Sequence, residues 1–323
     1  MNREITLSYV LTTRNKLPYL KEVMKRLLEN VQPDEEIVIT DGASTDGTVE
    51  YLTELYKLGK IHQFISEPDK GEAHGYNKGF LMAKGELIKF LSDDDVYDFQ
   101  VIAKCKEYMI SNLSIDLTFA NICCLNHSIA SNKLLLIKSY EIWFKEWVGK
   151  KVENCFFCGL SIMIRKKSLP FLGLFDTSFK HIDFEYSVRV TSKRANIAFC
   201  SHIMVCAIFN EMSISKNYEY IQKKEIERVS AYYNYIYLLG GKPVITEIQK
   251  NIFFRISKKL GLFHPIPRIE FYPNYNYELY DNIIYTDLTS LFNEIPKYLS
   301  DYNRSNKLEF ISNINMNSLS KIQ

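Results

Sequence analysis

The sequence has no long hydrophobic run, and its charges almost cancel. No apolar stretch reaches the ~20 residues that a membrane-spanning helix needs. Residues 1–4 lead straight into a strand-like run, so we expect no signal peptide and a cytoplasmic protein, with peripheral contact at the inner membrane face left open. Its 40 Lys and Arg residues balance 38 Asp and Glu residues, so net charge gives no support to a nucleic-acid partner.

Cysteine is too scattered for a disulfide framework. The chain of 323 residues has seven cysteines, which is an odd number. Cys155 and Cys158 have the CxxC spacing, but neither a second ligand pair for zinc nor a thioredoxin-like context accompanies them. We therefore expect buried apolar thiols.

The first part of the chain alternates strand-like and helix-like segments. Strands are predicted at 5–11, 36–40, 64–65 and 87–91, and helices from Pro18, from near Thr48 and over 73–82, with a polar turn at 12–15. This alternation predicts an α/β fold with a mostly parallel central sheet flanked by helices.

The later part of the chain is less regular. Short strands are predicted at 161–164 and 197–199, a helix at 184–190, and a long helical pattern at 218–239. The length suits one large α/β domain, which we place at 1–215, followed by a mainly helical extension at 216–323.

Three polar segments follow predicted strands. They contain Thr12 and Thr13, Asp41, and the acidic run of Asp93, Asp94 and Asp95. Ligands of such sheets bind beyond the carboxyl ends of the strands, so the three segments are expected at one edge. Three adjacent carboxylates repel each other unless a cation lies nearby, and Mg²⁺ or Mn²⁺ prefers oxygen ligands. Taken alone, the run fits a metal site and a solvated turn equally well.

Together the motifs resemble the GT-A glycosyltransferases of family 2. The matching stretches are residues 10–15, 37–48, 66–71, 77–79 and 85–95, which include Asp-Gly-Ala-Ser-Thr-Asp-Gly and Leu-Ser-Asp-Asp-Asp. The resemblance covers about two thirds of the chain. It implies a GT-A fold, an inverting mechanism and a nucleotide-diphosphate sugar donor, usually linked to UDP.

The resemblance also implies roles for individual residues. The nucleotide sugar would be bound by Thr12, Thr13, Asn15, Asp41, Asp69, Lys70, Asn77 and Asp93, with Asp41 accepting from the base. A Mn²⁺ or Mg²⁺ cofactor would lie on Asp94 and Asp95. Three positions depart from the family pattern. Ser92 stands where the metal motif commonly begins with Asp or Asn, His74 replaces a frequent Asp, and Ile182 stands where the family often has Glu before its catalytic acid.

The catalytic base is expected further along the chain. The segment at 173–189 resembles the family's segment with the acid that deprotonates the acceptor, which implies Asp183 as the base and Glu185 as the reserve. Outside the family context, both would be exposed acids on a helix that pair with Arg189 or Lys180.

The implied function is transfer of a sugar to an acceptor hydroxyl, on a saccharide or lipid-linked saccharide, in bacterial surface polysaccharide assembly. One alternative is a sugar-nucleotide nucleotidyltransferase, although the glycine-rich phosphate loop expected after its first strand is missing at 12–16. Another is a non-catalytic module that binds a nucleotide sugar. The stretch at 252–263 interleaves apolar residues with Arg255, Lys258 and Lys259, which fits either a helix on an anionic membrane or one packed on the catalytic domain.

Overall fold

The computed structural model describes residues 4–127, 132–152, 154–211, 224–225, 228–229, 259 and 277–314. Most of the predicted helical pattern at 218–239 and all but Lys259 of the stretch at 252–263 lie outside the described residues. In the described part of the chain, no helix is both long and apolar enough to cross a bilayer.

One half of the central sheet is parallel, as predicted. Its strands run in the order β3 (Gln63–Ser66), β2 (Glu35–Asp41), β1 (Leu7–Thr13) and β4 (Leu87–Leu91). β1 and β2 are buried along their whole length, and their apolar centres, Tyr9–Leu11 and Ile37–Ile39, belong to the hydrophobic core.

The other half of the sheet is mixed. Beyond β4 lie β8 (Met163–Arg165), β6 (Leu117–Asn126), β7 (Lys133–Ile137) and β10 (Tyr277–Asn282). The long strand β9 (Ile197–Phe209) pairs with β6 in parallel and with β5 (Val96–Tyr97) and β11 (Phe310–Ser312) in antiparallel. Two strands from the predicted extension therefore belong to the same sheet as the N-terminal strands.

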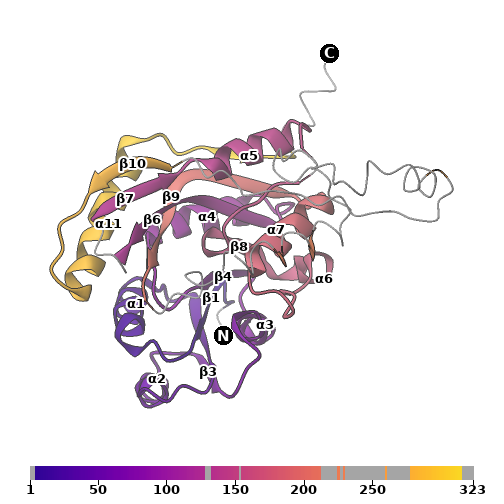
Figure 1. Ribbon diagram of the computed structural model, residues 1–323. Coiled ribbons are helices and arrows are strands. Elements are labelled where there is room, and N and C mark those ends of the chain that lie inside the picture. The colour runs from indigo at the N-terminus through magenta and orange to yellow at the C-terminus, as the bar shows by residue number, and fades with distance from the viewer. Residues whose placement is uncertain are drawn as a thin grey trace.

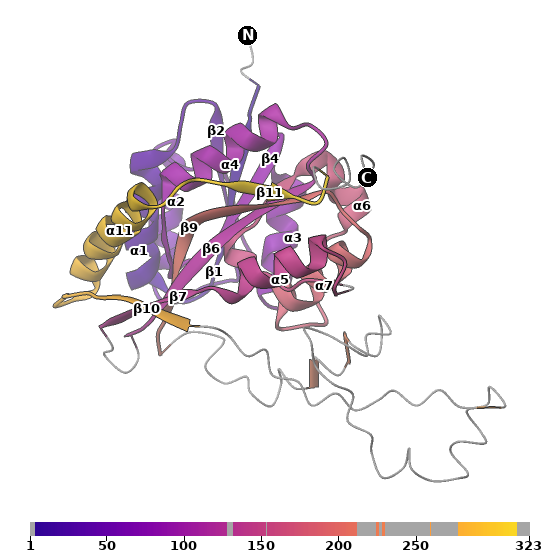
Figure 2. The same cartoon turned by 90° about the horizontal axis from the view of Figure 1, so that it is seen from above.

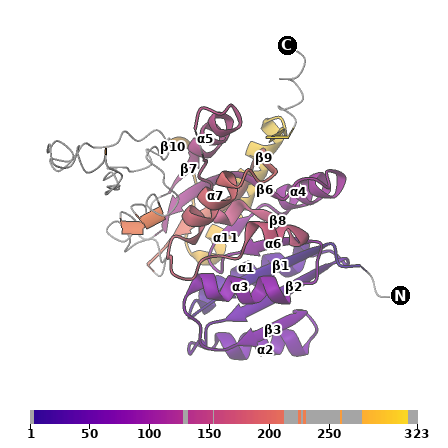
Figure 3. The same cartoon turned by 90° about the vertical axis from the view of Figure 1, so that its right-hand side faces the viewer.

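Helices cover both faces of the sheet (Figure 1). α4 (Phe99–Ser111) lies on one face of β6 and β9, and α5 (Ser139–Val148) and α7 (Ile182–Ser192) lie on the other (Figures 2 and 3). α11 (Leu288–Ser305) packs beside α1 (Leu17–Asn30). The other described helices are α2 (Thr48–Lys57), α3 (Glu72–Met82), α6 (Leu169–Leu172) and the 3₁₀ turns η2 (Gly159–Ser161) and η3 (Lys166–Ser168).

Two glycines of α3 set how closely this helix approaches β1. A Cβ at Gly75 would overlap the Thr12 side chain, and a Cβ at Gly79 would overlap Val10. Larger residues would push α3 away from the sheet. The close contact fixes the N-terminal end of α3 beside the carboxyl edge of β1.

Several local predictions need correction. Thr12 and Thr13 are the last residues of β1 and not a turn, because their β-branched side chains suit a strand and they pair with Thr40 and Asp41. The strand predicted at 161–164 is the end of η2 followed by β8. The prediction for cysteine is confirmed, since all seven thiols are free and buried.

Candidate active site

The acidic run follows β4 and is bonded directly to the end of β1. Thr13 Oγ1 donates to Asp93 Oδ2 at 2.7 Å. Lys16, the residue just before α1, places its Nζ 2.6 Å from Asp94 Oδ2 and 3.3 Å from Asp93 Oδ1. The parallel pairing of β1 with β4 brings these two strand ends together. The predicted proximity of Thr13 to the acidic run is therefore confirmed.

The three carboxylates have different surroundings. Both Asp93 oxygens are bonded, to Thr13 and Lys16. Asp95 accepts from the Ile208 amide at 2.7 Å and from the Ser92 hydroxyl, which ties the acidic run to β9. Asp94 Oδ2 accepts from Lys16 and from Asn210 Nδ2 at 2.9 Å, and within the described ranges no hydrogen bond reaches Asp94 Oδ1. Among the described residues, Asp94 Oδ1 is thus the carboxylate oxygen of the run that accepts no hydrogen bond.

The run carries more negative charge than Lys16 neutralises. All three aspartates are only 6% exposed. Burial raises the pKa of Asp93 and of Asp95, and the neighbouring Asp94 raises both further, while Lys16 opposes the shift. Burial alone would lower the pKa of Lys16, but Asp93 and Asp94 more than reverse this effect, so the ammonium stays charged. The site is therefore short of positive charge.

A divalent cation fits this arrangement when substrate phosphates complete its coordination. In the described part of the chain, no three His, Cys, Asp or Glu side chains are arranged to hold an ion by themselves. Mg²⁺ is typically held by one or two carboxylates plus phosphate oxygens. Asp94 Oδ1, beside a buried run with excess negative charge, meets that requirement, and a metal role for Asp95 stays a prediction.

The predicted base-binding residue Asp41 is completely buried at the end of β2. Its carboxylate accepts from the Ser44 amide at 2.9 Å and from Ser66 Oγ at 2.7 Å. Asn15 has a φ of 54°. Its backbone N–H donates to Ser44 Oγ, and its side-chain Oδ1 accepts from the Thr45 backbone amide at 2.7 Å. These bonds join the loops after β1, β2 and β3 into one polar surface.

Asp69 and Lys70 lie in the loop before α3, on the same side as that surface. Asp69 Oδ1 accepts from the Gly71 amide at 2.9 Å, and a Cβ at Gly42 would lie 2.8 Å from Asp69 Oδ2. The Lys70 amide donates to His74 Nδ1 at 3.1 Å, so the histidine that departs from the family pattern holds this turn. Contacts of Asp69 and Lys70 with a nucleotide stay a prediction.

Asn77 and Thr12 lie deeper in the protein. Asn77 Nδ2 donates to the Phe175 carbonyl at 2.8 Å, and its Oδ1 accepts from the Phe175 amide at 2.9 Å. Thr12 lies against Gly75 of α3. Both side chains contact other parts of the protein in this structure, and their predicted roles in donor binding are untested.

Asp183 lies in the first turn of α7 and points toward η2. Its Oδ2 accepts from the Gly159 amide at 3.1 Å. Burial raises the pKa of Asp183, while the Gly159 amide and His181 oppose the shift. The buried Lys89 of β4 donates to Leu160 in the same turn at 2.5 Å, and burial lowers its pKa to about 7. Asp183 is therefore a partly desolvated carboxylate on a supported turn, as a general base needs.

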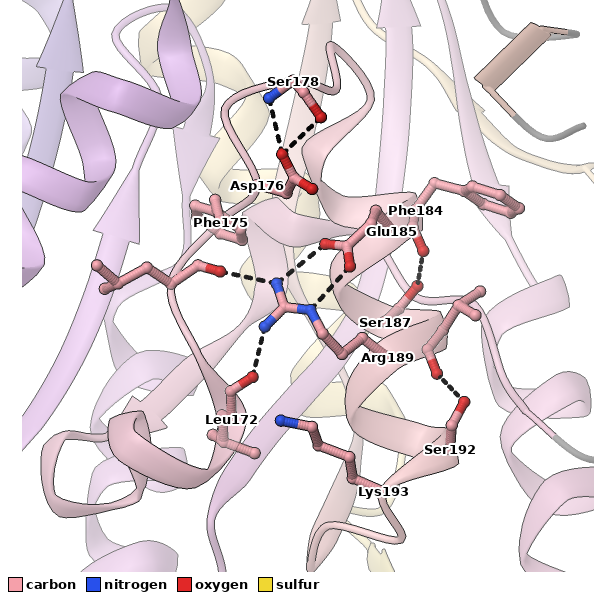
Figure 4. A network of polar contacts seen from close by, with 12 residues as sticks. Leu172, Phe175, Asp176, Ser178, Phe184, Glu185, Ser187, Arg189, Ser192 and Lys193 are labelled. Atoms are coloured by element: carbon pink, nitrogen blue, oxygen red, sulfur yellow. Dashed lines mark hydrogen bonds and ion pairs between the residues drawn. The ribbon is translucent and has the colours of Figure 1, made fainter. Parts of the chain in front are cut away.

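Glu185 lies on the same helix but in a different environment. It forms a two-pronged ion pair with Arg189, in which Nε and Nη2 donate to its two oxygens at 2.8 and 2.9 Å (Figure 4). Arg189 also donates to the carbonyls of Leu172 and Leu174. Glu185 is only 2% exposed, so the pairing foreseen with Arg189 is present but buried. A catalytic role for Glu185 stays a prediction.

Sequence reasoning missed two charged residues of this site, Lys16 and Glu72. Burial raises the pKa of Glu72 to about 7, and Asp183, Asp93 and Asp94 add to the shift against the opposing Lys16. Glu72 thus lies within electrostatic reach of both the acidic run after β4 and the predicted base on α7. Its position at the N-terminus of α3, directly after the 66–71 motif, was the available signal.

A family model described as glycosyl transferase family 2 matches residues 8–172. A Bacillus subtilis protein named as the teichuronic acid biosynthesis glycosyltransferase TuaG is 30% identical over 104 residues, which cover 32% of this chain and 41% of that protein. The first two curated relatives are thus matched over less than half of their own length.

Solved structures share the fold. The Staphylococcus aureus TarS fragment 1-349 in complex with UDP-GlcNAc has a TM-score of 0.54 at 15% identity, covering 73% of this chain and 68% of that one. The mannosyltransferase PcManGT from Pyrobaculum calidifontis, in complex with GDP-Man and Mn²⁺, has a TM-score of 0.50 at 16% identity, covering 72% and 65%. These structures confirm the predicted GT-A fold.

Proposed function

The chain belongs to glycosyl transferase family 2, and from that premise we propose that it transfers a sugar from a nucleotide diphosphate to an acceptor hydroxyl with inversion at the anomeric carbon. One observation carries the proposal. The acidic run with Asp94 Oδ1 and the partly buried carboxylate of Asp183 both lie within electrostatic reach of Glu72, so the proposed leaving-group site and the proposed base lie near each other.

The donor would bind along the loops after β1, β2 and β3. Asp41, held by Ser44 and Ser66, is the acceptor for a base N–H, and its bonded serines would have to share it with the ligand. In this proposal Asp69 and Lys70 contact the ribose and phosphates, and Thr12, Thr13 and Asn15 line the nucleotide pocket. We propose UDP as the nucleotide, since the similar TarS structure holds UDP-GlcNAc.

The chemistry is a single displacement. Asp183 accepts the proton of the acceptor hydroxyl, and the electron pair left on the hydroxyl oxygen forms the new bond to the anomeric carbon. The bond from that carbon to the diphosphate oxygen breaks, and its electrons leave with the nucleotide. A bound Mn²⁺ or Mg²⁺ would neutralise charge on the leaving diphosphate, with Asp94 as ligand. Lys16, whose Nζ lies 2.6 Å from Asp94 Oδ2, would supply a second, fixed positive charge beside the leaving diphosphate.

The acceptor we propose is a saccharide or lipid-linked saccharide of a bacterial surface polysaccharide. The name of the TuaG relative, which refers to teichuronic acid biosynthesis, supports this class. A lipid-linked acceptor would bring the protein to the inner membrane face, with 252–263 as the membrane contact. Liposome co-sedimentation tests that contact, and unchanged binding after replacement of Arg255, Lys258 and Lys259 would reject it.

A screen of UDP-, GDP- and dTDP-sugars, with and without Mn²⁺, tests the function. We expect metal-dependent turnover with one nucleotide class. Asp94→Ala should weaken binding of metal and donor, whereas Asp183→Asn should bind the donor normally and fail to transfer. Full activity of Asp183→Asn would reject the assignment of the base.

A further inference from the structure

The turn before α7 is held by two side chains that come from far along the sequence. Glu225 Oε1 accepts from the Lys180 amide at 2.7 Å, and Glu225 Oε2 accepts from the His181 amide at 2.8 Å. Oε2 also lies 3.0 Å from His181 Nδ1. Hydrogen bonds to an ionised carboxylate are stronger than those between neutral groups, so this contact fixes the backbone that enters α7.

Arg228 holds the preceding residues of the same turn. Its Nη1 donates to the Ser178 carbonyl at 3.1 Å, its Nη2 donates to Ser178 Oγ at 2.7 Å, and its guanidinium lies 4.2 Å from the centre of the Phe179 ring. Ser178 is also bonded to Asp176, and both lie in the loop that leads to α7 (Figure 4). Residues 178 to 181 are therefore held from within the loop and by Glu225 and Arg228.

Glu225 acts at a helix start that receives no capping hydrogen bond from its own N-cap side chain. His181 is the N-cap residue of α7, and its side chain makes no capping hydrogen bond. Amides at the start of a helix have no partner inside the helix and favour a nearby anion. Glu225, which is 8% exposed, supplies that anion from outside the loop.

We propose that Glu225 is a positioning residue that aims the base Asp183 by capping the turn from which α7 begins. Asp183 is two residues beyond the His181 amide that Glu225 binds, and its own contact is the Gly159 amide at 3.1 Å. Release of the turn would let the carboxylate move away from η2. This inference rests on the proposed function for its catalytic consequence, but the structural contact can be tested without it.

If Glu225 positions Asp183, the part of the chain that is needed for catalysis extends at least to residue 225. Glu225 lies beyond the matched range 8–172 and beyond the boundary predicted at 215. A fragment that stops at 215 would keep the acidic run, Asp41 and Asp183 but lose Glu225. It would also lose β10, β11 and α11, so the role of Glu225 has to be tested in the full-length chain.

Glu225→Ala and Glu225→Gln in the full-length chain test the proposal, with Glu107→Gln on the exposed face of α4 as matched control. Displacement of a catalytic group by about 1 Å can cost about 100-fold in rate, so we expect kcat of Glu225→Ala to fall about 10- to 100-fold. Glu225→Gln keeps one acceptor oxygen, so its kcat should lie between that of Glu225→Ala and that of the wild type. The Kd for UDP and the KM for donor should stay within about twofold.

Hydrogen exchange of the peptide that spans 178–185 separates this inference from the proposed function. We expect faster exchange in Glu225→Ala and no change in Glu107→Gln. Unchanged exchange or unchanged kcat in Glu225→Ala would overturn the positioning role, as would equal losses in kcat and UDP affinity. If the wild type transfers no sugar at all, the proposed function fails, and the exchange result alone decides whether Glu225 holds the turn.

Discussion

Lys16 places its ammonium 2.6 Å from Asp94 Oδ2, so the acidic run is bonded to a cation from the chain's own first loop. The Lys16 side chain is 12% exposed and also reaches Asp93. A metal ion bound at Asp94 would therefore act next to a fixed positive charge. This relationship leads to the first prediction.

Lys16→Met should lower the melting temperature in metal-free buffer. Loss of one partner from a largely buried ion pair costs about 3 kcal/mol, because the remaining carboxylates stay desolvated. Mn²⁺ should raise the melting temperature of this variant more than that of the wild type, since the ion can replace the missing charge. Thermal unfolding across a Mn²⁺ titration measures both effects. Lys104→Met on exposed α4 is the control, and equal Mn²⁺ shifts in variant and wild type would contradict the prediction.

Asp94 and Asp95 should respond differently to conversion to asparagine. Asp94→Asn should reduce metal-dependent transfer with little loss of stability, because the amide oxygen can still accept from Lys16 and Asn210, and Lys16 keeps its ion pair with Asp93. Asp95→Asn should lower stability by about 1–3 kcal/mol, because an amide cannot accept from both the Ile208 amide and Ser92. Urea unfolding and direct Mn²⁺ titration of both variants check this. A stable Asp95→Asn variant with weakened Mn²⁺ binding would make Asp95 a metal ligand instead.

Asn77→Ala tests whether Asn77 binds the donor or holds the loop at Phe175. The side-chain amide satisfies both backbone groups of Phe175, so its removal should cost about 1–3 kcal/mol of stability. If the structural role dominates, the Kd for UDP should change less than twofold. A loss of UDP affinity at unchanged stability would instead support the predicted contact with the donor.

Glu185→Gln distinguishes the reserve base from a structural ion pair. The variant keeps one acceptor oxygen for Arg189 and loses the charge, so we expect a lower melting temperature and nearly normal kcat below that temperature. Arg189→Met should show the same pattern. Steady-state kinetics at 20 °C and thermal unfolding give the two readouts, and a stable Glu185→Gln protein without activity would restore Glu185 as a candidate base.

On the acidic side, kcat/KM should fall at a pH above the usual pKa range of aspartate; this fall is the acidic limb of the pH–rate profile. Burial raises the pKa of Asp183, and the base works only when it is deprotonated, so activity should be lost as pH falls through a value above about 4. A pH–rate profile of the wild type measures this limb, and a limb within the usual pKa range of aspartate would count against Asp183 as the base.

Much of the site was readable from the sequence because it depends on local patterns. Alternating apolar and turn segments predicted the parallel strands, and strand ends predicted that Thr13, Asp41 and the acidic run share one edge. The order of the short motifs by itself indicated the family. These features follow from strand period, turn chemistry and the geometry of parallel sheets, which act over short stretches of chain.

Only the tertiary structure decided which partners these residues have. Lys16 meets Asp94 across 78 residues, Asn77 meets Phe175 across 98, and Glu225 meets Lys180 across 45. No periodicity or spacing encodes such pairs, because they depend on sheet register and on how closely α3 packs on β1. The sequence by itself determined the kinds of groups at the site. The fold determined which carboxylate oxygens are already bonded and which are exposed to a ligand, because long-range packing sets the distances between them.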